Sequence, residues 1–155
     1  MSVKSQETNM RSLAGLLSQD LGYIWGEREA GPSGAKKTFL NLGKVFLRAL
    51  AKDLGLREAK ITSDSGGIAV SGGCDLIGMW ENGGIYISLS QFCGGKYVLL
   101  YRTARNIRDY TGGYNNFLSL DDLRKLSYSE LLGKLRNLRK EDSAHERSSR
   151  NDWAA

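Results

Sequence analysis

Residues 75–103 read DLIGMW-ENGG-IYISLSQF-CGGK-YVLLYRT, and their side chains alternate with a period of two. In the run at 85–92, Ile and Leu at the odd positions 85–89 alternate with Tyr and Ser at the even positions 86–90. This predicts a strand with one buried face and one solvent-facing side. Asn82-Gly83 is the strongest hairpin signal, because a type I′ turn needs positive φ at both central residues.

The same alternation extends to both sides of this stretch and predicts five strands. They are expected at 59–63, 67–71, 75–80, 85–92 and 97–103. The connections between them are short and rich in glycine, which indicates neighbouring antiparallel strands. The sequence therefore predicts a β-meander.

Helical periodicity flanks the meander. Apolar residues at helical spacing predict helices at about 5–22 and 35–54, with Ser33 as N-cap and Gly55 just after the second helix. Later, capping boxes beginning at Ser119 and Ser127 predict C-terminal helices. The fold class is α+β: two N-terminal helices, an antiparallel meander of four to five short strands, and C-terminal helices on one face of the sheet. We expect one domain at 1–140 and a charged, disordered tail at 141–155.

Charge and hydropathy limit the partners. The net charge is +5, and the tail holds four acids and two arginines, so residues 1–140 carry +7. A basic body favours an anionic partner, either nucleic acid or an acidic protein surface. No stretch reaches the ~20 apolar residues of a membrane span. The first ten residues lack the apolar region of a signal peptide, so we expect a cytoplasmic protein without a membrane partner.

The sequence offers little catalytic chemistry. The single histidine, His145, lies in the tail, so His-based triads and metal sites are not expected in the domain. Cys74 and Cys93 are predicted to be reduced, half-buried strand residues. The stretch 31–38 resembles a phosphate-binding loop but lacks the required glycine before Lys37. We therefore expect no enzyme activity, no metal and no cofactor, although a carboxylate–Mg²⁺ nuclease is not excluded by sequence.

Two groups of residues are candidates for partner binding. On the second helix, basic residues recur on one side, and this basic stripe consists of Lys37, Lys44, Arg48 and Lys52. It could follow a phosphate backbone, or it could be an ordinary solvated helix face. With Lys36 and Lys37, the free N–H groups at the start of this helix could also hold a phosphate or carboxylate.

The stretch 101–116 combines arginines, tyrosines, amides and a Gly-Gly pair in a predicted loop. Its candidate binding residues are Arg102, Arg105, Arg108, Tyr110, Tyr114 and Asn115. Tyr and Arg anchor protein interfaces, and they also stack on single-stranded nucleic acid. The alternative is a structural loop whose tyrosines cover the core.

Three segments carry a resemblance to a known group of proteins: GYIWG at 22–26, GGIAVSG at 66–72 and DYTGGYN at 109–115. With them the chain resembles small accessory proteins of phages and plasmids, including anti-CRISPR inhibitors and accessory domains of mobile-element proteins. The resemblance implies a non-enzymatic inhibitor of a bacterial host defence complex, such as a CRISPR effector, acting as a monomer or a homodimer. Because the body is basic, mimicry of DNA is not expected.

Two functional hypotheses follow. The first is a protein-binding inhibitor of a nucleic-acid-handling defence complex, encoded by a mobile element and acting in the host cytoplasm. The alternative is a basic nucleic-acid-binding module that contacts phosphates through the second helix and the 102–116 loop. The second hypothesis requires that these two basic surfaces converge in space.

Overall fold

The computed structural model describes residues 2–22, 34–66, 71–110 and 112–138. The described elements are α1 (Val3–Leu17), α2 (Gly34–Asp53), β1 (Glu58–Asp64), β2 (Gly73–Trp80), β3 (Gly83–Phe92), the short 3₁₀ turn η2 (Cys93–Gly95), β4 (Tyr97–Ala104), β5 (Asn116–Ser119), α3 (Leu120–Lys125) and α4 (Tyr128–Arg136). The predicted tail at 141–155, with His145, lies outside the described residues.

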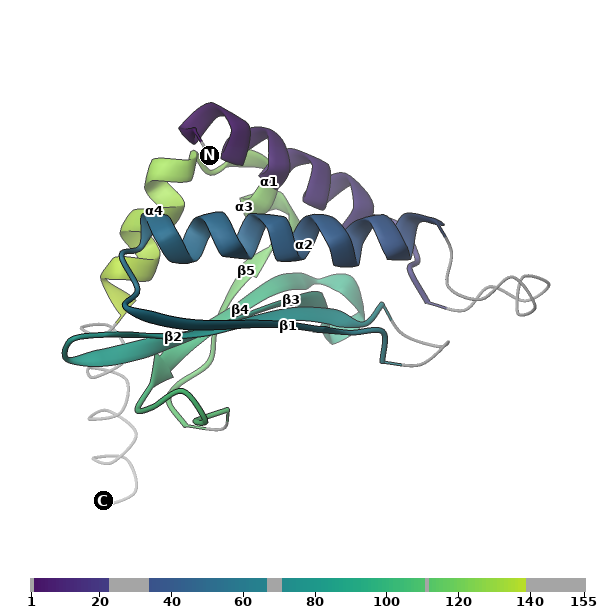
Figure 1. Cartoon of the computed structure of the whole chain (residues 1–155). Helices are drawn as coiled ribbons and strands as arrows, with labels where there is room; N and C mark the ends of the chain where they lie inside the picture. The colour runs from purple at the N-terminus through teal and green to yellow at the C-terminus, as the bar shows by residue number, and fades with distance from the viewer. Residues whose placement is uncertain (1, 23–33, 67–70, 111, 139–155) are drawn as a thin grey trace, which may run out of the picture.

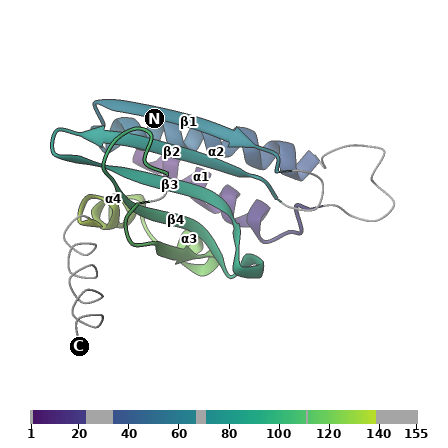
Figure 2. The same cartoon turned by 90° about the horizontal axis from the view of Figure 1, so that it is seen from below.

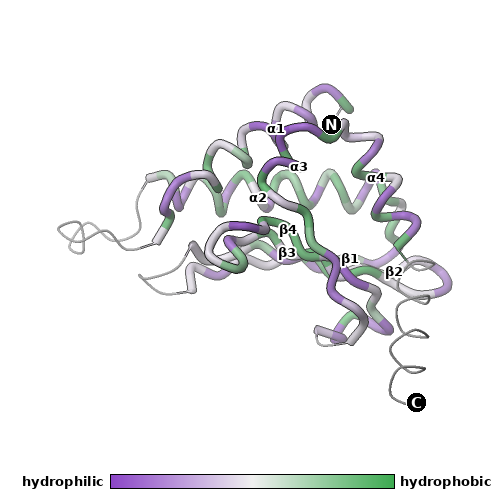
Figure 3. Tube along the Cα trace, turned by 180° about the vertical axis from the view of Figure 1, so that it is seen from behind, coloured by the Kyte–Doolittle hydropathy of each residue, from purple (hydrophilic) through white to green (hydrophobic). Residues whose placement is uncertain are grey.

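The sheet is an antiparallel meander with strand order β1-β2-β3-β4-β5. The four described helices lie on one side of it, and in Figures 1 and 2 no helix of the described residues lies on the other side. We call the second side the open face. The α+β fold class predicted from the sequence is therefore confirmed. Figure 3 shows the mostly apolar stretches of β3 and β4 beneath α2.

Alternation within the strands separates the two faces. Ile85, Ile87 and Leu89 of β3 belong to the core beneath the helices, as does Cys74 of β2. Tyr86 alternates with them and therefore points to the open face. The period-two pattern that predicted the strand also predicted which side is buried.

Most helix ends follow their sequence signals. Gly55 follows α2 with a φ of 72°. The N–H of Gly55 donates to the Lys52 carbonyl oxygen, and the N–H of Leu56 donates to the Ala51 carbonyl oxygen. These two bonds form a Schellman motif. Ser119 and Ser127 form the expected capping boxes, in which Asp122 and Glu130 bond back to the N-cap N–H groups. The predicted N-cap Ser33 lies outside the described residues.

The first helix is shorter than predicted. It ends at Leu17 rather than near residue 22, although Leu21 is still buried in the core. The Gln91 side chain of β3 donates to the carbonyl oxygens of Leu17 and Gln19, at 3.0 and 2.5 Å. These bonds satisfy carbonyl groups at the helix end that would otherwise lack a partner. The partner is more than seventy residues away in sequence, so local periodicity gave no sign of it.

The strand predictions need three corrections. The β2–β3 turn is centred on Glu81 and Asn82, because Gly83 pairs with Trp80, and neither central residue has positive φ. The predicted type I′ turn at Asn82-Gly83 is therefore wrong in both position and type, although the hairpin itself is confirmed. β1 pairs directly with β2, and Ser71 belongs to no strand; the rest of the predicted strand 67–71 lies outside the described residues. The fifth strand is β5, where no strand was predicted; only its first residue, Asn116, lies in the stretch predicted to be a loop.

Helix α2 approaches the sheet closely at Gly43. A Cβ atom at this position would lie 2.6 Å from Cys74 Sγ and 3.2 Å from Cys74 Cβ. The Cys74 thiol also donates to the Leu40 carbonyl oxygen at 3.3 Å. Glycine therefore sets the distance between the helix and the sheet, since any other side chain would push them apart.

The two cysteines differ from each other and partly from the prediction. Cys74 is fully buried on β2, and burial, reinforced by the Asp75 charge, raises the pKa of its thiol to about 11. Cys93 is exposed in η2 with a φ of 53°, so the prediction of a half-buried strand residue is wrong. The strand had to end there, because a left-handed residue and Gly94 form the tight connection to β4.

We expect these two thiols to react at very different rates with a thiol reagent at about pH 8. Cys93 should react at once, whereas Cys74 should react at least about a hundredfold more slowly until the protein unfolds, because only accessible thiolate is nucleophilic. The measurement is mass spectrometry of the labelled chain with and without denaturant. In Cys93→Ser the fast phase should disappear; rapid labelling of Cys74 in the folded variant would contradict the assignment.

Candidate functional site

The 105–115 loop connects β4 to β5 and folds beneath the open face, where Figure 2 shows it crossing the sheet in front of the strands. The Tyr110 ring packs edge-on against Tyr86 of β3, with ring centroids 6.0 Å apart. Asn115 accepts a hydrogen bond from the Arg102 guanidinium of β4 at 3.3 Å. The loop therefore lies against the sheet and is not a free connection.

Hydrogen bonds within the loop order its backbone. The Asp109 carboxylate accepts from the N–H groups of Arg105 and Gly112, at 3.0 and 2.8 Å. The Asn106 side chain accepts from the N–H of Arg108 at 2.9 Å. Such bonds from Asp and Asn side chains to nearby backbone groups stabilise turns. The loop consequently presents its outer side chains from a defined backbone.

Those outer side chains are two tyrosines and two arginines. Tyr110 and Tyr114 are 40% and 43% exposed, which places both among the exposed large hydrophobic residues of the described chain. Arg105 and Arg108 are exposed beside them in sequence. We call these four residues the Tyr/Arg surface. The structural alternative also finds support, because Tyr110 packs on Tyr86 and Gly113 takes a φ of 83°.

Arg102 behaves differently from the other predicted binding residues. The residue is only 7% exposed, and its guanidinium lies over Tyr86, with the guanidinium carbon 4.3 Å from the ring centroid. Its Nη1 donates to Asn115, whereas its buried Nε and Nη2 have no hydrogen-bond partner among the described residues. A buried donor without an acceptor costs roughly 1–3 kcal/mol.

Beside Arg102, three residues form a polar group on β2 and β3. Ser88 donates to the Asp75 carboxylate at 2.6 Å, and these two residues lie opposite each other in the strand register. Burial, with the charge and hydrogen-bond acceptance of Asp75, raises the pKa of Tyr86 to about 12. The neutral phenol is thus favoured in the folded protein.

We expect Tyr86→Phe to reduce the loss of stability at alkaline pH. A folded-state pKa of about 12, against about 10 for an unfolded tyrosine, contributes stability that is present below pH 10 and is lost as the pH rises towards 12. Between pH 10 and pH 12, the unfolding free energy of the variant should fall by about 1–2 kcal/mol less than that of the wild type. Urea unfolding at several pH values checks this, with the exposed Tyr114→Phe as the matched control. Equal pH profiles for Tyr86→Phe and wild type would contradict it.

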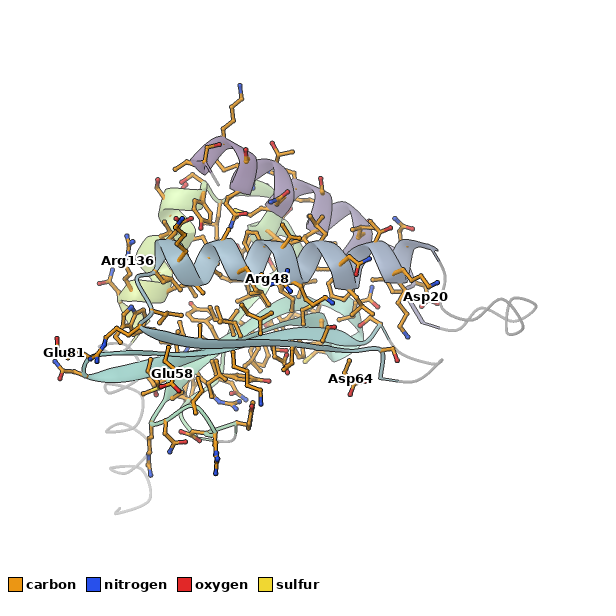
Figure 4. All side chains as sticks on the ribbon, in the orientation of Figure 1. Asp20, Arg48, Glu58, Asp64, Glu81 and Arg136 are labelled. Carbon is orange, nitrogen blue, oxygen red and sulfur yellow. The ribbon has the colours of Figure 1, made fainter. Side chains whose placement is uncertain are left out.

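The basic stripe lies on a different side of the molecule. Lys37, Arg48 and Lys52 are exposed and Lys44 is partly buried on α2, which packs over β1 and β2 on the helix side of the sheet. Figure 4 shows Arg48 on this helix, across the sheet from the 105–115 loop. The two basic surfaces predicted from the sequence therefore do not converge. Lys36, suggested as an anion contact, is buried, and this burial lowers its pKa.

Two hollows lie elsewhere on the described surface, with volumes of about 420 and 530 Å³. The first has Trp80, Glu81 and Arg136 in its wall, and the second has Gln19, Ser71 and Gln91. Neither contains any of the ten predicted binding residues. Within the described ranges, no group of three His, Cys, Asp or Glu side chains is arranged to hold a metal ion.

The sequence prediction found the loop but missed three residues beside it. Asp75, Tyr86 and Ser88 were predicted only as strand residues. Of the three, Tyr86 contacts Tyr110 of the loop, and the pairing of β2, β3 and β4 brings Asp75 and Ser88 together beside it. Their signal was the alternation that placed Tyr86 and Ser88 on the polar side of the strand. What the alternation could not show is that the loop returns to that side.

Comparison with protein-family models, with curated proteins and with solved structures finds no match to this chain. Among the described residues, no helix has the length and apolar character needed to cross a membrane.

Proposed function

We propose that this protein is a non-enzymatic inhibitor that binds a protein complex through the Tyr/Arg surface. The observation that carries the proposal is an ordered loop that exposes Tyr110 and Tyr114 beside Arg105 and Arg108. Tyrosine and arginine contribute most to binding energy at protein interfaces, and a pre-ordered loop loses little entropy on binding.

The class of target comes from the sequence. The resemblance to phage and plasmid accessory proteins makes a nucleic-acid-handling defence complex of a bacterial host, such as a CRISPR effector, the proposed target. The basic charge of residues 1–140 supports an acidic partner surface. Host cytoplasm is the corresponding compartment, and both monomeric and homodimeric inhibitors are compatible with the proposal.

Direct nucleic-acid binding through both predicted basic surfaces has less support. A duplex or strand would have to contact α2 and the 105–115 loop together, and these lie on opposite sides of the sheet. Phosphate recognition normally uses several cations along one track. Nucleic-acid binding is therefore the alternative that the capture experiment below distinguishes from protein binding.

The test is affinity capture from bacterial lysate, with and without nuclease treatment, using the tagged full-length chain and two charge-matched variants. Arg105→Gln/Arg108→Gln removes two charges from the loop, whereas Lys37→Gln/Arg48→Gln removes two from α2. We expect the loop variant to capture at least about tenfold less of the complex than the wild type does. The amount captured by the α2 variant should stay within about twofold of the wild-type amount. The purified complex should then lose its nucleic-acid cleavage activity when wild-type protein is added.

Three results would count against the proposal. An equal loss in both variants would indicate a non-specific effect of charge. Capture of nucleic acid alone, abolished by nuclease and falling steeply with salt, would favour the nucleic-acid-binding alternative. A captured complex whose activity is unchanged by the protein would exclude an inhibitor of that activity.

A further inference from the structure

The two edges of the sheet differ in length and regularity. β1 and β5 are the outer strands, and among the described residues no strand pairs with the outer side of either. β5 has four residues, and its pairing with β4 shifts register between Tyr97 and Leu99. β1 has seven residues without a proline, and all of them pair with β2 in one unbroken register. A long, regular edge of this kind accepts a further strand, because its outer N–H and C=O groups lie in a row.

β1 is open to solvent on both of its sides. Six of its seven residues are exposed, and Ile61 is partly buried against the core beneath the helices. Because side chains alternate along a strand, Ala59 and Ser63 point to the same side as Ile61. Both of them are nevertheless exposed. Helix α2 therefore leaves room along the outer edge of β1.

The basic stripe lies on the flank of α2 that overlooks this edge. Gly43 faces β2, and with about 100° of turn per residue Lys44 lies to one side of Gly43 and Phe46 to the other. The Phe46 side is occupied by α4, whose Tyr128 packs edge-on against the Phe46 ring. Lys44 is therefore on the opposite flank, and Figure 4 shows Arg48 of the same stripe above β1.

A row of backbone groups and a row of cations thus run along the same edge of the molecule. α2 packs over β1, and the cations of the stripe are Lys37, Lys44, Arg48 and Lys52. A strand added to β1 would lie about 5 Å from it and would point every second side chain towards the helix side. Carboxylates at those positions would meet the basic stripe.

We propose that the outer edge of β1 is a docking site for an extended acidic segment of a partner protein. The segment adds to the sheet as a strand and places carboxylates at alternate positions against the basic stripe. In this mode of recognition the main-chain hydrogen bonds supply affinity and the alternate side chains supply specificity. The intervening residues of the segment face the side of β1 that carries Glu58 and Asp64, so neutral side chains fit there.

This inference goes beyond the proposed function. The edge of β1 is a second site, separate from the Tyr/Arg surface, and its ligand is not the complex that binds that surface.

The charges on this edge disfavour two other occupants. If two copies of the chain paired through β1, their basic stripes would face each other across the new pair of strands, and like charges in such an arrangement repel. A nucleic-acid strand would be attracted by the stripe, but it has no row of peptide groups to pair with β1. An acidic polypeptide matches both the backbone edge and the stripe.

The experiment is an NMR titration of the isotope-labelled full chain at constant ionic strength. The probe is a blocked peptide of about eight residues that alternates threonine and glutamate. We expect saturable shifts of the backbone amide signals of Glu58–Asp64, with slower hydrogen exchange at the outer edge. The same peptide with every amide nitrogen methylated keeps its charge but donates no backbone hydrogen bond, so it should bind at least about tenfold more weakly.

Two charge-matched variants test the contribution of the stripe. Lys37→Gln/Arg48→Gln should bind the peptide at least about fivefold more weakly than the wild type, because two of the facing cations are removed. Arg105→Gln/Arg108→Gln, which removes two charges from the other side of the sheet, should stay within about twofold of the wild type. The two variants have the opposite roles in the capture experiment, so failure of this inference is distinguishable from failure of the proposed function.

Each other result overturns the inference. Unchanged signals in β1 would mean that its edge takes no strand, and wild-type affinity in Lys37→Gln/Arg48→Gln would mean that the stripe does not face the ligand. Equal binding of the methylated peptide would mean attraction of charge without strand addition. Tighter binding of an oligothymidylate at the same amides would assign the edge to nucleic acid. Concentration-dependent shifts of these amides without peptide, together with a dimer in sedimentation, would assign it to a second copy of the chain.

Discussion

In the Gly43→Ala variant the free energy of unfolding will fall by about 2–3 kcal/mol, because the new methyl group cannot fit between α2 and β2. Its Cβ would lie 2.6 Å from Cys74 Sγ, and the sulfur is fully buried with no space to retreat. Urea denaturation measures this loss. The matched control is Gly133→Ala on α4, where no atom lies within 4 Å and the helix preference of alanine should stabilise by up to about 1 kcal/mol.

A second substitution tests the cause of this effect. In Gly43→Ala/Cys74→Ala the sulfur is gone, and the new Cβ lies 3.2 Å from the remaining Cβ of residue 74. We expect the double variant to be about 1–2 kcal/mol more stable than the sum of the single losses predicts. Simple additivity would show that the cost at Gly43 has another origin than the Cys74 sulfur.

The second large effect concerns Tyr128, which joins three helices through its buried hydroxyl. This hydroxyl donates to the Asp53 carboxylate of α2 at 2.6 Å and accepts from the Gln6 amide of α1 at 3.3 Å. Burial and the bond to Asp53 both raise the pKa of Tyr128. We expect Tyr128→Phe to lower the unfolding free energy by about 2–3 kcal/mol, since a hydrogen bond to a charged group is lost and its partners remain.

The control for Tyr128→Phe is Tyr110→Phe, which removes a hydroxyl from an exposed residue and should change stability by less than about 0.5 kcal/mol. A double-mutant cycle with Asp53→Asn separates the hydrogen bond from general packing. We expect a coupling of about 1–2 kcal/mol between the two positions. A coupling near zero would show that the hydroxyl of Tyr128 is not stabilised by Asp53.

Local signals in the sequence predicted the fold well. Both capping boxes, the Gly55 helix end and the meander are confirmed, because each depends on residues within a few positions of one another. The errors lie where a distant partner decides the outcome. Where helix α1 ends, Gln91 of β3 bonds the Leu17 carbonyl oxygen, and β5 forms where Leu118 pairs with Leu99 of β4. Four-residue strands have too few alternations to be recognised from sequence alone.

The candidate site was predicted only in part, for the same reason. The residue types of the loop were correctly identified as interface-forming, but composition could not show that Arg102 is buried while Arg105 and Arg108 are exposed. That difference depends on β4 ending at Ala104, which leaves Arg102 on the sheet and the other two arginines on the loop. Nor could sequence show that α2 and the loop lie on opposite sides of the sheet.

The position of α1 has a consequence for synthesis of the chain on the ribosome. Its buried residues Met10, Leu13 and Leu17 pack in a core that α3 and α4 complete, and its Gln6 bonds to Tyr128. α1 leaves the exit tunnel before α3 and α4, which emerge more than a hundred residues later. The β2–β4 hairpins contain only local pairings and can form before then. Until α3 and α4 emerge, the side of α1 that they cover stays exposed, although α2 packs against α1 and follows it directly. This interval is when chaperones would bind the exposed side.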